Sequence, residues 1–82
     1  MKKFYVYILL TERNTYYCGY TDNVEKRYKL HIKGLGAKYT KANKPVKLLW
    51  TKEFDNKIDA QKEEYRIKKK LTRKQKEELI FG

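Results

Sequence analysis

Three ionisable side chains interrupt the apolar faces of two predicted helices. The first helix is predicted over residues 22–33, where His31 falls within the apolar stripe and Arg27 lies beside it. The second is predicted over residues 57–70, where Glu64 falls within the buried face. An unpaired buried charge is costly, so these three side chains need either partners or a cleft.

These residue types are suited to one kind of chemistry. Arginine neutralises phosphate oxygens with a fixed forked geometry, histidine or tyrosine can move a proton, and a lone carboxylate can hold a hydrated Mg²⁺. The combination favours metal-assisted cleavage of a phosphodiester. Glu64 is the only carboxylate on a buried helix face, which favours one metal ion over a two-metal site. In the structural alternative, Glu64 pairs with Arg27 and His31 donates a hydrogen bond to the backbone.

The remaining residues of the two faces are apolar and define how each helix should pack. The first helix is expected to turn three residues toward a sheet, namely Val24, Tyr28 and Leu35. The buried face of the second is defined by Ala60, Ile67 and Leu71.

The charge of the chain indicates a polyanionic partner. Its 82 residues predict a single domain, spanning residues 1–82, and 21 Lys+Arg against 10 Asp+Glu give a net charge of +11. Such a surface attracts nucleic acid first. A membrane surface is disfavoured because no basic helix has a bulky apolar face. The competing explanation is that the positive charge serves only solubility.

The chain has one cysteine, Cys18, and one histidine. An internal disulfide and a Cys/His zinc site are therefore excluded. No signal peptide precedes the first apolar run, FYVYILL, so we expect a cytoplasmic protein. Cys18 itself is predicted to be a small buried hydrophobe.

The elements that must position these residues form an α+β pattern. Strands are predicted over residues 4–10, 16–20 and 46–54, helices over 22–33, 57–70 and from 72 onward, and a basic loop or short helix over 37–44. The order β-β-α-β-α-α predicts a small three-stranded antiparallel sheet flanked by helices.

Local signals fix several helix boundaries. Asp22 with Glu25, and Thr72 with Gln75, have the spacing of capping boxes. Gly34 and Gly36 are expected to stop the first helix.

The second predicted strand, YYCGYT, carries phenols on both faces. Alternation places Tyr17 and Gly19 on one face and Tyr16, Cys18 and Tyr20 on the other. Only Tyr17 is a candidate for the site, and its partner phenol is expected to lie outside this stretch.

The ordered set of these residues resembles the GIY-YIG nuclease domain. The resemblance is carried by Tyr5-Val6-Tyr7, Tyr17-Cys18-Gly19, Arg27, His31 and Glu64. It covers essentially the whole chain and is closest to small stand-alone members, which end in a segment like EYRIKKKLTRKQKEELI. It implies the GIY-YIG fold and a metal-dependent endonuclease that hydrolyses DNA phosphodiester bonds, with structure-specific cleavage in repair or recombination as a candidate role.

The resemblance also implies roles for the residues on the two strands. Tyr7 would be the general base toward the attacking water, and Tyr17 would contact the phosphate or the metal-bound water. Which of the two phenols is the base stays open. Gly19 would permit close backbone approach beside them.

On the helices, the resemblance assigns the charged steps. Arg27 would stabilise charge on the scissile phosphate, and His31 would assist proton transfer or orient a neighbour. Glu64 would ligate a single Mg²⁺ or Mn²⁺.

Departures from the family pattern bear on substrate choice. Tyr5-Val6 replaces the glycine and isoleucine of the first tripeptide, and Cys18 replaces the isoleucine of the second. We expect no targeting domain beside the nuclease core, so substrate recognition is expected to come from the chain's own surface or from a protein partner. The alternative function is a nucleic-acid-binding module, for DNA or RNA, that keeps the scaffold with little activity.

Substrate contacts outside the core set are predicted at basic and aromatic positions. Tyr39 with Lys38 and Lys41 forms a candidate phosphate-tracking loop with one stacking ring, although a solvated loop would look the same. Lys68 begins a basic run that could contact a nucleic-acid backbone.

Overall fold

The computed structural model describes residues 2–82 and contains one sheet and four helices. The elements, in chain order, are β1 (Phe4–Thr11), β2 (Tyr16–Thr21), α1 (Val24–Ile32), α2 (Lys38–Ala42), β3 (Pro45–Phe54), α3 (Lys57–Lys70) and α4 (Arg73–Phe81). None of the helices in this range is long and apolar enough to cross a membrane.

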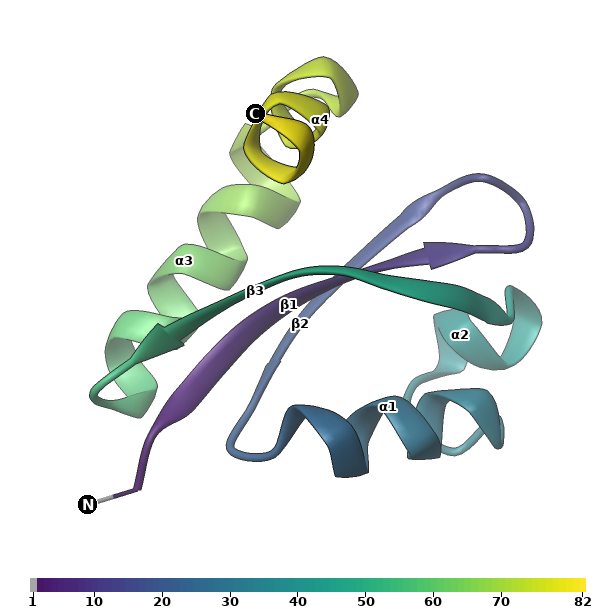
Figure 1. The fold of residues 1–82 in the computed structure, drawn as a ribbon, viewed down its shortest axis with the longest axis horizontal. Coiled ribbons are helices and arrows are strands. Elements are labelled where there is room, and N and C mark those ends of the chain that lie inside the picture. Colours follow the sequence, from purple (N-terminus) through teal and green to yellow (C-terminus); the bar gives the residue numbers. More distant parts are fainter. Residues whose placement is uncertain (1) are drawn as a thin grey trace.

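The sheet is antiparallel, with strand order β2-β1-β3. Helices α1 and α2 lie on one side of it, and α3 and α4 lie on the other (Figure 1). The predicted α+β class and the three-stranded antiparallel sheet are confirmed. The segment predicted as a loop or short helix forms α2, so the full order is β-β-α-α-β-α-α.

Because β1 is the central strand, its alternate residues reach opposite faces. Val6 and Ile8 are buried with Cys18 of β2 and with Ala60 and Ile67 of α3. This cluster is the hydrophobic core, and it confirms that Cys18 is a small buried hydrophobe. Tyr7, the residue between them, points to the other face, where it contacts His31 of α1. Each face of β1 therefore meets a different helix.

The helix caps agree with the prediction at one of two positions. Thr72 accepts from the backbone N–H of Gln75, whose side chain accepts from the backbone N–H of Thr72, so that capping box is confirmed. The cap of α1 is Asn23, not Asp22, because the Asn23 side chain accepts from the Lys26 N–H at 3.1 Å. Asp22 forms an ion pair with Lys2 instead.

The prediction that Leu35 faces the sheet was wrong. Helix α1 ends at Ile32, and Gly34 adopts a positive φ of 78°, which turns the chain before Leu35 is reached. Leu35 is therefore 72% exposed. The apolar stripe of the first helix ends one turn earlier than its periodicity indicated.

Candidate active site

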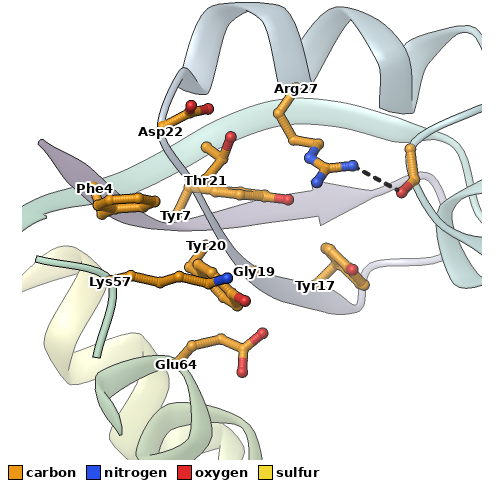
Figure 2. Close-up of a pocket in the computed structure, with 11 residues that line it drawn as sticks. Phe4, Tyr7, Tyr17, Gly19, Tyr20, Thr21, Asp22, Arg27, Lys57 and Glu64 are labelled. Carbon is orange, nitrogen blue, oxygen red and sulfur yellow. Dashed lines mark hydrogen bonds between the residues drawn. The ribbon is translucent and has the colours of Figure 1, made fainter. Parts of the chain in front are cut away.

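Five of the predicted site residues line a cavity of about 420 Å³ beside the edge strand β2. They are Tyr7, Tyr17, Gly19, Arg27 and Glu64. Arg27 reaches the cavity from α1 and Glu64 from α3, on opposite sides of β2 (Figure 2). The cavity therefore draws on both sides of the sheet.

His31 lies behind this cavity and is 1% exposed. Its Nε2 is 2.8 Å from the Tyr7 hydroxyl, and its Nδ1 is 2.6 Å from the Thr40 hydroxyl. The Thr40 hydroxyl also lies 3.2 Å from the Ala37 carbonyl, to which it can donate. The predicted alternative of a hydrogen bond from His31 to the backbone is therefore not observed.

Gly19 lies directly opposite Tyr7 in the β1–β2 register. A Cβ at position 19 would lie 2.5 Å from the Tyr7 hydroxyl oxygen, closer than real Cβ contacts. The missing side chain of Gly19 therefore leaves room for the Tyr7 ring, which reaches over from the neighbouring strand β1. Its predicted contact with substrate stays a prediction.

The inward charges do not neutralise each other. Among the described residues, Arg27 and Glu64 form no ion pair, and the Arg27 guanidinium instead donates to the Gly36 carbonyl at 3.4 Å. The Glu64 carboxylate lies 3.7 Å from Lys68 of the same helix and is 19% exposed. The structural alternative, an Arg27–Glu64 pair, is therefore not observed.

The donor set of the cavity fits a hydrated ion. Within residues 2–82, no group of three or more histidine, cysteine or carboxylate side chains could enclose a metal. Asp22 also lines the cavity, but its carboxylate is 2.7 Å from the Lys2 ammonium, which lowers its pKa. Glu64 is the cavity carboxylate with the longer lysine contact, 3.7 Å to Lys68, and its side chain is 19% exposed. One carboxylate with several waters is an arrangement that Mg²⁺ adopts in proteins.

The remaining predicted contacts lie outside this cavity. Tyr39 and Lys68 line a neighbouring cavity with Tyr17. The Tyr39 ring stacks on Tyr17 at 5.9 Å between centroids, and the Lys68 ammonium lies 5.6 Å from the centre of the Tyr17 ring. Lys38 and Lys41 are exposed on α2 and line neither cavity.

Comparison with known proteins adds the family. A family model described as the GIY-YIG catalytic domain matches residues 3–78. The chain belongs to the GIY-YIG family. This is a nuclease family, whose members bind nucleic acid and generally use divalent metal ions.

Several small GIY-YIG relatives resemble the chain along nearly all of its length. UPF0213 protein YsiG of Lactococcus lactis subsp. lactis is 52% identical over 80 residues, covering 98% of this chain and 77% of the relative. UPF0213 protein CPE1444 of Clostridium perfringens is 54% identical over 76 residues, covering 93% and 81%. The solution NMR structure of the UPF0213 protein BH0048 from Bacillus halodurans has a TM-score of 0.62 at 42% identity, covering 96% of this chain and 83% of the other. The likeness therefore extends over most of the length of these small proteins.

Burial sets the protonation states of Tyr7 and His31, the hydrogen-bonded pair beside the cavity. It raises the pKa of the Tyr7 hydroxyl well above its usual value, with a further increase from neighbouring Tyr17. Burial also lowers the pKa of His31, and the nearby Arg27 lowers it further. Both side chains are therefore neutral near pH 7.

Sequence reasoning missed two residues that contact this pair. Thr40 stood in the segment predicted as loop or short helix, and no local pattern indicates that its hydroxyl meets a ring nine positions earlier. Gly36 was expected only to stop a helix. A Cβ at Gly36 would lie 2.5 Å from His31 Nδ1, so this glycine lets the backbone approach the imidazole. The signal that could have found it was the glycine itself, five residues after a predicted inward histidine.

Proposed function

We propose that the chain is an endonuclease that hydrolyses DNA phosphodiester bonds with a single Mg²⁺ or Mn²⁺ held at Glu64. The observation that carries the proposal is that Arg27 and Glu64 line one cavity without pairing with each other. A cation and an anion left apart in one cleft suit a substrate that carries negative charge and brings a metal ion.

Tyr7 is the better placed of the two tyrosines to take the proton of water. Its hydroxyl is 2.8 Å from His31 Nε2, so its own proton has an acceptor. In the proposed step, a water oxygen forms a bond to phosphorus and gives a proton to the Tyr7 oxygen, while the Tyr7 proton passes to Nε2. The bond from phosphorus to the leaving sugar oxygen breaks, and that oxygen takes a proton from solvent. His31, whose lowered pKa disfavours the imidazolium, then returns its extra proton through Tyr7 to solvent. Tyr7 stays neutral throughout, which its raised pKa requires.

The charged groups of the cavity would hold the phosphate during this step. Arg27 offers a planar fork of donors that matches phosphate oxygens, and its contact with the Gly36 carbonyl, at 3.4 Å, is long enough to be exchanged for substrate. A divalent ion at Glu64, completed by waters, would neutralise charge on the phosphate as it develops. Tyr17, beside both, would contact the same phosphate.

Substrate binding is assigned to the positive surface. The net charge of +11 supports tight, salt-dependent contact with a nucleic-acid backbone. Lys68 adjoins Tyr17, and Tyr39 stacks on the same ring, so the backbone on one side of the scissile phosphate would run along this face. Lys38 and Lys41 would extend the contact over α2. A protein partner that supplies further targeting, and a role in repair or recombination, are parts of this proposal that only substrate tests can decide.

The test is a cleavage panel with matched variants. Single-stranded, duplex, flapped and four-way DNA, and RNA, are incubated with the protein with and without Mg²⁺ or Mn²⁺. Glu64→Gln removes the carboxylate charge that faces the cavity. Glu63→Gln is the control, because Glu63 is the neighbouring half-buried carboxylate of α3 but forms a two-point contact with Arg66 and does not line the cavity.

We expect divalent-dependent nicking of DNA that is lost in Glu64→Gln and kept in Glu63→Gln, with DNA affinity similar in all three proteins. Equal cleavage by Glu64→Gln and the parent would overturn the proposal. Salt-dependent binding without any divalent-dependent product would instead establish the alternative, a nucleic-acid-binding module on a nuclease scaffold.

A further inference from the structure

Thr40 is a fully buried polar residue whose contacts lead to the candidate active site. It lies on the five-residue helix α2 and is 0% exposed. Its hydroxyl oxygen is 2.6 Å from His31 Nδ1 and 3.2 Å from the Ala37 carbonyl oxygen. The opposite ring nitrogen, Nε2, faces the Tyr7 hydroxyl. Four groups thus form one chain of hydrogen bonds, and the positions of its protons follow from counting donors.

A hydroxyl has one proton to donate and a carbonyl has none. If Thr40 donates to Ala37, its oxygen is free to accept from Nδ1–H of His31. Nε2 of the neutral ring then carries a lone pair and accepts from Tyr7. All three hydrogen bonds of the chain are made in this arrangement.

The opposite arrangement makes only two of these bonds. Thr40 would donate to Nδ1, and Nε2–H would donate to the Tyr7 oxygen. The Thr40 proton would then be withdrawn from the Ala37 carbonyl, and the Tyr7 proton would need another acceptor. The second arrangement leaves the Tyr7 O–H without its acceptor on His31. The first is favoured because buried donors are rarely left without a partner.

We propose that Thr40 is a positioning residue that holds His31 in the Nδ1–H tautomer, so that Nε2 presents a lone pair to the Tyr7 hydroxyl. This deepens the proposed function, because a ring with a proton on Nε2 could not accept the proton of Tyr7. The hydrogen bond made by one ring nitrogen decides which state the other nitrogen has.

Gly36 supports the proposal independently of hydrogen-bond distances. A Cβ at this position would lie 2.5 Å from Nδ1 and 2.6 Å from Cγ of His31. The backbone therefore passes against the edge of the ring that carries Nδ1. This close passage fixes the orientation of the ring and places Nδ1 toward α2, where Thr40 is the hydroxyl that meets it.

The first experiment reads the tautomer directly. His31 is the only histidine of the chain, so long-range ¹H–¹⁵N NMR of the full-length protein at pH 8 reports this ring alone. We expect Nδ1 to show the signal of a protonated nitrogen and Nε2 that of a bare one in the parent. A parent with the proton on Nε2 would overturn the proposal, whatever the nuclease assays show.

Two substitutions then separate the hydroxyl from packing. Thr40→Val keeps the size and shape of the side chain but removes the acceptor, and Thr40→Ser keeps the acceptor but removes a methyl group. We expect the proton to move to Nε2 in Thr40→Val and to stay on Nδ1 in Thr40→Ser. If Thr40→Val does not fold, the spectra of the parent and of Thr40→Ser still decide the matter. A proton on Nδ1 in both proteins supports the proposal, and a proton on Nε2 in either one contradicts it.

Cleavage kinetics supply the second readout. We expect Thr40→Val to lower kcat by about 10- to 100-fold, by analogy with the loss of a hydrogen-bond partner that orients a metal-bound imidazole, with KM nearly unchanged. Thr40→Ser should restore most of kcat. Equal kcat in the parent and a folded Thr40→Val would contradict the proposal. A parent that cleaves nothing but has the Nδ1 proton would refute the proposed function and leave the positioning role supported.

Discussion

Substitution of Gly19 by alanine tests whether the β1–β2 register sets the position of Tyr7. The added Cβ would lie 2.5 Å from the Tyr7 hydroxyl oxygen and 2.7 Å from the ring carbon that bears it. An ordinary contact begins at 3.4 Å, so the hydroxyl must move by nearly 1 Å. Gly19 has no positive φ, so its substitution adds no backbone strain. The effect should therefore fall on Tyr7 and its 2.8 Å contact with His31.

A displacement of about 1 Å in a reacting group costs roughly 100-fold in rate. Gly19→Ala should therefore lower kcat by about this factor while DNA affinity changes little. Overpacking of a tight site should also reduce the free energy of unfolding by about 1–3 kcal/mol. Single-turnover cleavage, DNA titration and urea unfolding measure the three quantities.

The design includes Tyr7→Phe, which removes the same hydroxyl directly. In the Tyr7→Phe background, Gly19→Ala should cost little further activity, because both changes damage one group. A folded Gly19→Ala protein that cleaves at the parental rate would refute the reasoning.

Three further predictions concern stability, reactivity and binding. Burial lowers the pKa of His31 below its ordinary 6.5, so the unfolded chain binds its proton first as pH falls. The contribution of His31 to the free energy of unfolding should therefore be flat above pH 6.5 and decrease below it toward the folded-state pKa, by at most about 1.4 kcal/mol per pH unit. His31→Gln should abolish this part of the pH dependence in urea unfolding. Burial raises the pKa of the Cys18 thiol to about 12. A thiol reagent at pH 8 should therefore react at least about 100-fold faster with the denatured protein than with the native protein. Comparable rates would contradict the burial of Cys18. Replacing Lys38 and Lys41 by glutamine should reduce the slope of log K against log salt for DNA binding by about 2, whereas Lys29→Gln, already paired with Glu25, should leave it nearly unchanged.

Helix positions were predictable where the signal is local. Helix α3 spans Lys57–Lys70, as its periodicity predicted, and the Thr72–Gln75 box begins α4. Asp22 was misassigned as a cap because two cap-forming residues are adjacent, and its pairing with Lys2 comes from a distant part of the chain. Local patterns cannot rank such competing partners.

The site was predictable in composition but not in its contacts. Periodicity alone indicated that Arg27, His31 and Glu64 point inward. It could not show that Arg27 and Glu64 leave each other unpaired, or that His31 lies between Tyr7 and Thr40, because these contacts join elements that only the folded chain brings together. Periodicity fixes the direction of a side chain, and tertiary packing chooses its partner.

The most direct test of the proposed function is the single-turnover cleavage rate of the best DNA substrate as a function of Mn²⁺ concentration, for the parent, Glu64→Gln and Glu63→Gln. We predict a saturable, metal-dependent rate for the parent and for Glu63→Gln, and no metal-dependent rate for Glu64→Gln at equal DNA occupancy. A Glu64→Gln protein with the parental rate and the parental Mn²⁺ dependence would contradict the assignment of this cavity as a nuclease site.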